Sequence, residues 1–227
     1  KFERPRAIGV EAVSHNESFT VKGENIILSA GAIGSPHILM LSGIGPKEHL
    51  EDHGIESILD LQGVGQNLRD HPLISVAWAT KPNIKLNALA PRGQVMLRYT
   101  AKESPLENDM IIYFSAAAVR RENLDGKIAK PVGIGAGLGL NLAFSKGELR
   151  LTSGDYRDQP YLDYNLLSDE EDIRRYREGI QMLVSLENHH SISGLITHRL
   201  YPTDSDLESN GSLDRWIRKN VGTGHHV

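Results

Sequence analysis

The stretch from Gly31 to Gly45, GAIGSPHILMLSGIG, constrains the fold of this chain more than any other part of it. The preceding residues, Glu24–Ala30, have the apolar character of a buried strand. Gly31 has no side chain, so the backbone can turn sharply there or approach another group closely. Ser35 is a good helix N-cap and Pro36 suits the first helical position, which predicts a short helix over residues 37–41. The sequence therefore predicts strand, glycine turn and helix in succession.

Two interpretations of this turn are open from its residues alone. A glycine turn between a strand and a helix lets the backbone pass close to a dinucleotide, because the helix N-terminus offers free N–H groups and positive potential. The same pattern is also common as a plain connection in α/β folds.

The stretch resembles the second signature of the glucose-methanol-choline (GMC) family of flavin oxidoreductases. The matching positions are Gly31, Ala32, Ser35, Pro36, Ile38, Leu39, Ser42, Gly43, Ile44 and Gly45. The resemblance implies that this segment lines an FAD site, with Ser29, Ala30, Gly31, Ala32 and Ser35 as the cofactor-binding residues. In the family a separate Gly-x-Gly-x-x-Gly turn holds the pyrophosphate, and this chain lacks that turn. We therefore expect the chain to be an internal piece of a longer enzyme.

The fold class that follows is α/β or α+β. Residues 1–72 are expected to be the C-terminal part of a Rossmann-like FAD-binding domain, and residues 73–227 an antiparallel-sheet substrate domain covered by helices. In the first part, alternation predicts a hairpin from residues 7–13 and 18–22, and Pro46 and Gly54 bracket a second short helix.

In the second part the candidate strands share period-2 alternation between turn-rich segments, and one antiparallel sheet is predicted from 74–80, 94–100, 109–116, 134–144 and 148–152. A capping box over Ser168–Glu171 starts a long amphipathic helix that should cover this sheet. A further helix is expected to start at Gly211–Ser212.

Four glycines alternate along one predicted strand, at positions 133, 135, 137 and 139. They would share one face of the strand and leave it smooth, with the apolar residues on the other face. A covering helix, the more usual partner of strand glycines, would fit that face, and so would a substrate or flavin ring.

His225 and His226 are the candidate catalytic residues. Adjacent histidines make a poor chelating pair and no acid lies near them in the sequence, so no metal site is predicted. Without the resemblance they would ordinarily be interpreted as surface or hydrogen-bonded histidines. In the GMC family the segment after the last substrate-domain helix leads to the active-site histidine, which implies that role for His226, with His225 as its competitor. Asn67 and His71 lie in a stretch similar to the family's Asn-Leu-x-Asp-His, and they either stabilise a loop or approach the cofactor.

Composition excludes several classes of function. The formal charge is −4 with dispersed positive residues, so nucleic-acid binding has no support, and no apolar run is long enough to span a bilayer. The chain has no cysteine, which excludes disulfides and thiolate chemistry within it but does not fix a compartment. Localisation and oligomeric state stay open.

The function implied by the resemblance is oxidation of a small-molecule alcohol to a carbonyl, with hydride transfer to FAD and histidine as the base. Two alternatives stay open: a hydroxynitrile lyase of the same family, and a non-catalytic homologue. The piece alone is expected to be inactive. The resemblance is weakest over residues 81–130, which in the family form much of the substrate pocket, so the alcohol is not named.

Overall fold

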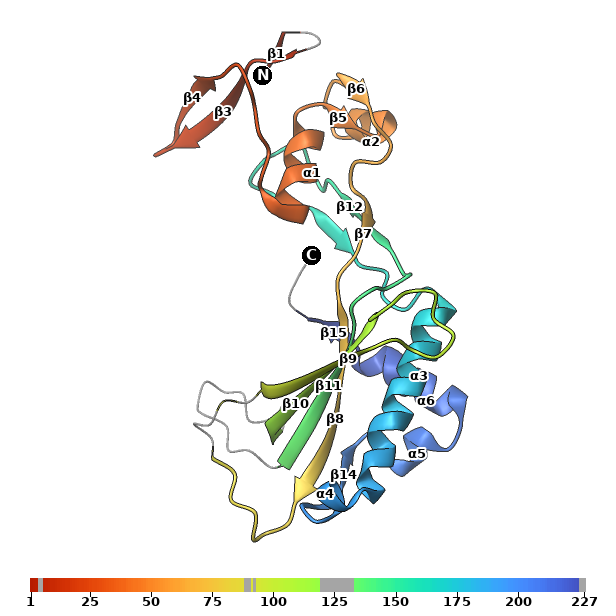
Figure 1. Cartoon of the computed structure of the whole chain (residues 1–227). Coiled ribbons are helices and arrows are strands. Elements are labelled where there is room, and N and C mark those ends of the chain that lie inside the picture. Colours follow the sequence, from red (N-terminus) through yellow and green to blue (C-terminus); the bar gives the residue numbers. More distant parts are fainter. Residues whose placement is uncertain (4–5, 88–90, 92, 119–132, 225–227) are drawn as a thin grey trace. The chain divides into compact units, whose positions relative to one another are not determined.

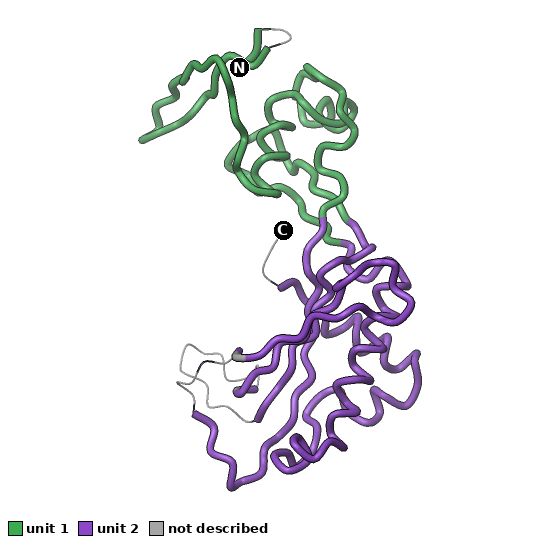
Figure 2. The backbone as a smooth tube through the Cα atoms, in the orientation of Figure 1, with its two compact units in different colours: residues 1–68, 147–164, 227 green, residues 69–146, 165–226 purple. Residues whose placement is uncertain are grey.

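The computed structural model describes residues 1–3, 6–87, 91, 93–118 and 133–224. The chain divides into two compact units (Figure 2). Unit 1 is made of residues 1–68 and 147–164, and unit 2 of residues 69–146 and 165–226. Unit 1 is therefore discontinuous in sequence, because a second segment of the chain returns to it.

Unit 1 opens with short antiparallel pairs of strands. β1 (Phe2–Glu3) pairs with β2 (Arg6–Ala7), and β3 (Gly9–Ser14) pairs with β4 (Glu17–Lys22). The predicted hairpin is confirmed. His15 and Asn16, between its strands, both have positive φ, 51° and 66°, as the tightest hairpin turns require.

Helix α1 (Gly31–Leu41) is longer than predicted and begins earlier (Figure 1). Its N-cap is Ala30, and Ser35 is not a cap: its Oγ accepts a hydrogen bond from the Ala30 N–H at 3.1 Å. Pro36 lies inside the helix. The predicted strand over residues 24–30 was wrong, since these residues form no strand and Ile27 is 84% exposed. A lone strand has no ladder to satisfy its backbone, and no described strand pairs with this segment.

The rest of unit 1 surrounds a small core. α2 (Lys47–Asp52) lies between Pro46 and Gly54 as predicted, and β5 (Ile44–Gly45) pairs in parallel with β6 (Leu59–Asp60). β12 (Gly147–Arg150) lies between β13 (Tyr161–Asp163) and β7 (Gln66–Leu68). The buried residues of this core are Met40, Leu50, Val64, Leu149 and Leu151.

The prediction that residues 148–152 belong to the same antiparallel sheet as the strands of residues 74–144 was therefore wrong. Their strand pairs with β7 and β13 instead, because alternation identifies a strand but not its partners.

Unit 2 is built on a six-stranded antiparallel sheet. Its order is β14 (Ile196–Tyr201), β8 (Pro72–Thr80), β11 (Gly133–Leu140), β10 (Met110–Ala118) and β9 (Gly93–Tyr99). A short strand, β15 (Gly222–Thr223), also pairs with β8. The four long strands predicted for residues 74–144 are confirmed in this sheet.

Helix α3 (Glu170–Ser185) covers one face of the sheet, together with α6 (Asn210–Asn220) (Figure 1). Its apolar stripe, Ile173, Tyr176, Ile180 and Leu183, is fully buried against residues such as Leu138. The caps lie beside the predicted ones: Asp169 rather than Ser168 caps α3, and Ser209 caps α6. The shorter helical elements are η2 (Leu186–Asn188), α4 (His190–Ser193) and α5 (Asp204–Leu207).

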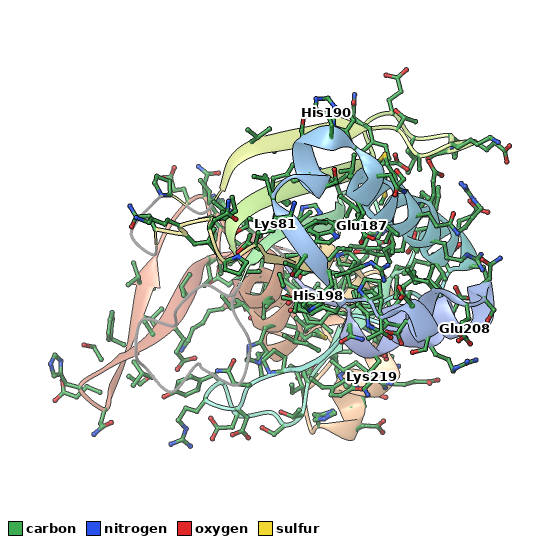
Figure 3. All side chains as sticks on the ribbon, turned by 90° about the horizontal axis from the view of Figure 1, so that it is seen from below. Lys81, Glu187, His190, His198, Glu208 and Lys219 are labelled. Carbon is green, nitrogen blue, oxygen red and sulfur yellow. The ribbon has the colours of Figure 1, made fainter. Side chains whose placement is uncertain are left out.

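Glu187, labelled in Figure 3, fastens η2 to the sheet. Its Oε1 accepts hydrogen bonds from the Trp78 indole N–H at 2.7 Å and from the Arg199 guanidinium at 2.5 Å. These bonds tie η2 to both β8 and β14.

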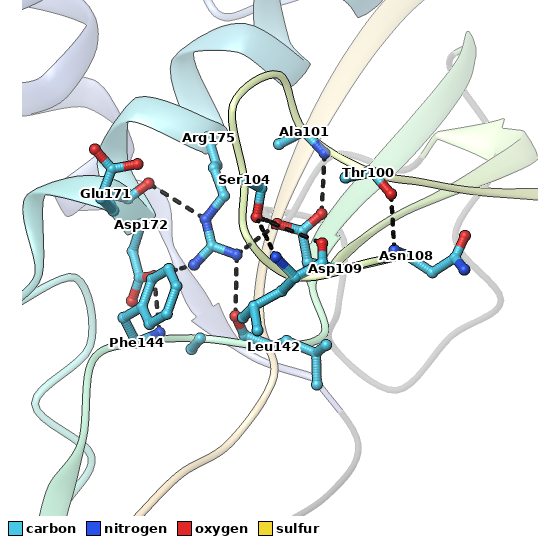
Figure 4. A network of polar contacts seen from close by, with 12 residues as sticks. Thr100, Ala101, Ser104, Asn108, Asp109, Leu142, Phe144, Glu171, Asp172 and Arg175 are labelled. Atoms are coloured by element: carbon cyan, nitrogen blue, oxygen red, sulfur yellow. Dashed lines mark hydrogen bonds and ion pairs between the residues drawn. The ribbon is translucent and has the colours of Figure 1, made fainter.

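A buried ionic network joins α3 to the loops at one end of the sheet (Figure 4). Arg175, Asp109 and Asp172 have fully buried side chains, and the arginine pairs with both carboxylates. Asp172 also accepts the backbone N–H groups of Phe144 and Ser145, and Arg175 donates to the Leu142 carbonyl at 3.0 Å. The network therefore fixes the backbone that follows β11.

None of the helices in the described part of the chain has the length and apolar character needed to cross a membrane.

Candidate functional site

The N-terminus of α1 presents unpaired backbone donors. The N–H groups of Gly31, Ala32 and Ile33 precede the first intrahelical hydrogen bond of α1, and the N-cap residue, Ala30, has no side chain that could accept a hydrogen bond from them. The first turn carries no acidic residue. These donors and the helix dipole give the segment a positive potential that suits an electron-rich ligand group.

The space beside Gly31, at this end of the helix, is open to a ligand. Gly31 has φ +79°, and a Cβ placed there would meet no atom within 4 Å. Ser29, Ala30, Gly31 and Ala32 are exposed, while Ser35 is half-buried and holds the Ala30 N–H. All five residues assigned to the cofactor from the sequence thus lie at one helix end in unit 1.

In unit 2 two glycines of β11 lie on the face of the sheet opposite α3. Leu138 and Leu140 point to the α3 side, so Gly137 and Gly139 face the opposite side. The atoms nearest to a Cβ on these two glycines belong to β8 and β10, namely to Leu73, Tyr113, Ile111 and Pro72. The covering-helix interpretation of the glycine face was therefore wrong for the described residues, because α3 packs on the other face.

A cavity of about 310 Å³ lies on this face of the sheet, at Gly139. Its lining residues are His71, Pro72, Leu73, Arg98, Ile111, Tyr113, Gly139, Asn141, Leu142 and Gly224. The register explains the grouping, since Arg98 lies opposite Ile111, Ile111 opposite Gly139, and Gly139 opposite Leu73. The polar groups of Arg98, Tyr113, Asn141 and His71 thus surround an apolar floor, the usual composition of a small-molecule site.

Gly224, which lines this cavity, directly precedes the candidate catalytic pair in the sequence. Gly222 and Thr223 pair with Leu73 and Pro72 of β8, and the Gly224 N–H donates to the His71 carbonyl at 2.9 Å. A Cβ at Gly224 would come within 3.1 Å of Leu73, so glycine fits this close approach. His225 and His226 themselves lie outside the described residues.

Asn67 and His71 belong to different units. His71 lines the cavity, and Asp70 accepts its backbone N–H at 2.6 Å. Asn67, in β7 of unit 1, is exposed and has φ +62°. The described residues contain no group of three or more side chains suited to bind a metal ion.

Sequence reasoning missed Arg98, Tyr113 and Asn141 as site residues. Each is an unremarkable polar residue in or beside an alternating strand, where an outward-facing side chain is expected. The glycine pattern on β11 was the available signal, because a smooth strand face implies that something occupies it.

Comparison with known proteins gives the family. Residues 1–73 and residues 143–227 match the N- and C-terminal models of the family described as GMC oxidoreductase. The chain is 31% identical to an oxygen-dependent choline dehydrogenase of Photobacterium profundum, covering 97% of this chain and 42% of that protein. It is also 31% identical to choline oxidase of Arthrobacter globiformis, covering 97% of this chain and 41% of that one.

Solved structures share the fold. A crystal structure described as pyridoxine 4-oxidase from Mesorbium loti matches with a TM-score of 0.86 at 24% identity, over 100% of this chain and 44% of that one. A formate oxidase structure matches with a TM-score of 0.80 at 22% identity, over 96% of this chain and 46% of that one.

The chain belongs to the GMC oxidoreductase family, whose members use FAD. It is similar over nearly its whole length to the choline-oxidising relatives named above, and it spans less than half of their length. The open, uncapped N-terminus of α1 fits an FAD, since that end supplies backbone donors and the room that a close ligand needs.

Proposed function

We propose that the protein containing this chain oxidises a small alcohol to a carbonyl compound with FAD as the hydride acceptor. The observation that carries the proposal is the cavity of unit 2, from whose wall, at Gly224, the chain leads directly to the two candidate histidines. Membership of the GMC family, with relatives named choline dehydrogenase and choline oxidase, supports the same reaction class.

The base in this proposal is His226, with His225 as the competing candidate. A neutral imidazole can accept the alcohol hydroxyl proton near physiological pH, because its ordinary pKa lies close to that range. FAD, when bound, supplies the acceptor for the hydride that leaves the carbinol carbon. The strands under the cavity hold the alcohol in place, and the apolar floor of Leu73 and Ile111 limits the entry of water.

The cofactor role belongs to unit 1 in this proposal. Ser29, Ala30, Gly31 and Ala32 offer exposed backbone at the α1 N-terminus, and Ser35 holds the Ala30 N–H so that the helix start keeps its shape. We assign residues 1–72 to the FAD-binding domain and residues 73–227 to the substrate domain. The segment 147–164 packs with residues 1–68 in the compact unit.

The test is the rate of flavin reduction by an alcohol in anaerobic stopped-flow experiments on the FAD-loaded protein and its variants. His226→Ala should slow flavin reduction by about 10²–10⁴-fold, as expected for loss of a general base, and abolish the rise of the rate with pH. His225→Ala is the matched control and should change the rate far less. The reverse pattern would transfer the base role to His225, and normal rates in both variants would contradict histidine catalysis at this position.

A further inference from the structure

We propose that the alcohol taken by the unit 2 cavity carries a carboxylate, and that Arg98 binds this carboxylate. The inference rests on the proposed function, because it names the substrate class of that site: a small hydroxy acid rather than a neutral or cationic alcohol. Arg98 is then a specificity-determining residue.

Arg98 reaches the cavity because of its register in the sheet. It lies on the edge strand β9 directly opposite Ile111, in the same cross-strand row as Gly139 and Leu73. Directly opposite residues on antiparallel strands project to the same face, so Arg98 projects to the face of the sheet that carries Ile111 and Leu73. All four residues of this row line the cavity, and the side chains of Ile111 and Leu73 approach each other over Gly139, which has no side chain of its own.

Most N–H donors of the Arg98 guanidinium have no acceptor among the described residues. Its one described hydrogen bond runs from Nη2 to the Asn108 carbonyl at 3.0 Å, which anchors the side chain, and no described carboxylate pairs with it. A guanidinium has five N–H donors in a planar fork that matches a carboxylate. Arginines elsewhere in the chain do have carboxylate partners, namely Arg150, Arg157, Arg174, Arg175, Arg177, Arg199 and Arg218.

The charge of the residues that line the cavity favours an anionic ligand over a cationic one. Among the described residues that line it, none is an aspartate or glutamate. The acids nearest in sequence to the lining have other partners: Asp70 accepts the His71 N–H, and Asp109 pairs with Arg175. A quaternary ammonium would therefore meet Arg98 without a compensating carboxylate among the described lining residues. One permanent cation also suits the single charge of a carboxylate better than a doubly charged phosphate.

The location of Arg98 in the sequence is consistent with a role in specificity. Residues 74–142 lie outside both family models, and they contain Arg98, Ile111, Tyr113, Gly139 and Asn141. The residues that would set the substrate are thus in the part of the chain that the family models do not match.

The test measures binding of three small molecules of equal chain length and different charge, none of which has a hydroxyl to oxidise. Butanoate, butanamide and propyltrimethylammonium, which share a propyl tail, are titrated into the FAD-loaded protein by calorimetry. Butanoate should bind about tenfold or more tightly than either of the others, as expected for a charge-assisted fork. Arg98→Gln should remove this preference and Arg98→Lys should keep part of it. Arg215→Gln is the matched control, because Arg215 also lacks a described carboxylate partner but lies on α6 outside the cavity.

Equal binding of the three molecules, absence of butanoate binding at millimolar concentrations, or an unchanged preference in Arg98→Gln would overturn the inference. The visible spectrum of the same sample separates its failure from that of the proposed function. A protein with flavin that alcohols reduce, but with no preference for butanoate, would contradict only the assignment of Arg98. A protein without flavin would contradict the proposed function.

Discussion

Two arginines illustrate how burial decides what a charged residue does in this chain. Arg98 is exposed at the rim of the cavity, and within the described part of the chain its guanidinium donates one hydrogen bond, to a carbonyl, so its charge is available to a ligand. Arg175 is completely buried between two carboxylates and donates to the Leu142 carbonyl beside the cavity. Burial alone would raise the pKa of Asp109, but hydrogen bonds from Ser104, Ala101 and Arg175 outweigh it and lower that pKa.

Replacement of Arg175 by methionine should destabilise unit 2 by about 3–5 kcal/mol, because it leaves two buried carboxylates without their cation. Arg174→Met is the matched control one residue away. Arg174 pairs with Glu171 and Glu178 at the surface of the same helix, and its loss should cost less than about 1 kcal/mol. The free energies are measured by amide hydrogen exchange in α3, and equal costs for the two variants would contradict the role given to the buried network.

At the scale of elements, α3 depends on a glycine for its close approach to the sheet. A Cβ at Gly179 would lie 2.7 Å from a Leu138 methyl carbon and 2.8 Å from the Tyr99 hydroxyl. Both neighbours are in strands of the sheet, so the helix can pack at this distance only without a side chain there.

Gly179→Ala should therefore destabilise unit 2 by about 1–3 kcal/mol through overpacking, although alanine is the better helix former. Gly211→Ala in α6 is the control, since the nearest atom to its Cβ would be 3.6 Å away, on the flexible end of Arg215. That change should be neutral or stabilise by up to about 1 kcal/mol. The thermal unfolding midpoint should fall for Gly179→Ala and should stay unchanged or rise for Gly211→Ala. A higher midpoint for Gly179→Ala would contradict the close packing of α3 on the sheet.

A second link between elements depends on a neutral histidine. The Leu151 N–H donates to His49 Nε2 at 2.9 Å, which connects the segment after β12 to α2. Burial, followed by the charges of His53 and Arg150, lowers the pKa of His49. Because the pKa of His49 is lowered, the folded unit binds fewer protons than the unfolded chain when the pH is near 6.5 or below. The contribution of neutral His49 to the stability of unit 1 is therefore complete at pH values above the ordinary histidine pKa of 6.5 and is lost as the pH falls below it.

Protection of the Leu151 amide against hydrogen exchange, corrected for the intrinsic rate, should therefore decrease as the pH falls from 7.5 through 6.5 and below. In His49→Gln, which has no proton to gain, the protection should not vary with pH over this range. Constant protection in the unchanged protein would show that His49 is not the acceptor that holds this segment.

Local patterns predicted most of the elements, and long-range pairing accounts for the failures. Alternation identified the hairpin and the four long strands of the sheet, and the Ile173–Leu183 stripe identified α3. The same patterns could not show that β12 joins β7 and β13, because a strand's partners are set by contacts far away in the sequence. The early start of α1 was missed for another reason: Ser35 and Pro36 have the pattern of a helix start, yet Gly31 begins the helix and Ser35 binds back to Ala30.

The candidate site was predictable only in part. The residues at the α1 N-terminus could be named because a contiguous signature carries them, and the glycines of β11 indicated that their face is occupied or approached. Arg98 could not be named, since it reaches the cavity through a register that joins β9, β10, β11 and β8.

At the scale of the whole molecule, the chain contains two cores with different members. Unit 1 packs around Met40 and Leu50, and unit 2 packs α3 and α6 on its sheet. The proposed functions divide in the same way, with the cofactor segment at the start of α1 and the substrate cavity on the glycine face of β11. Variants in one unit can therefore test the proposed role of that unit and leave the core of the other unit unchanged.

We propose that the protein containing this chain transfers hydride from an alcohol to FAD. The most direct measurement is the visible spectrum of the purified protein under anaerobic conditions, before and after addition of primary and secondary alcohols that include hydroxy acids. We expect flavin bands to be present and at least one alcohol to bleach them. Flavin bands that no alcohol bleaches, or a spectrum without flavin, would contradict the proposal.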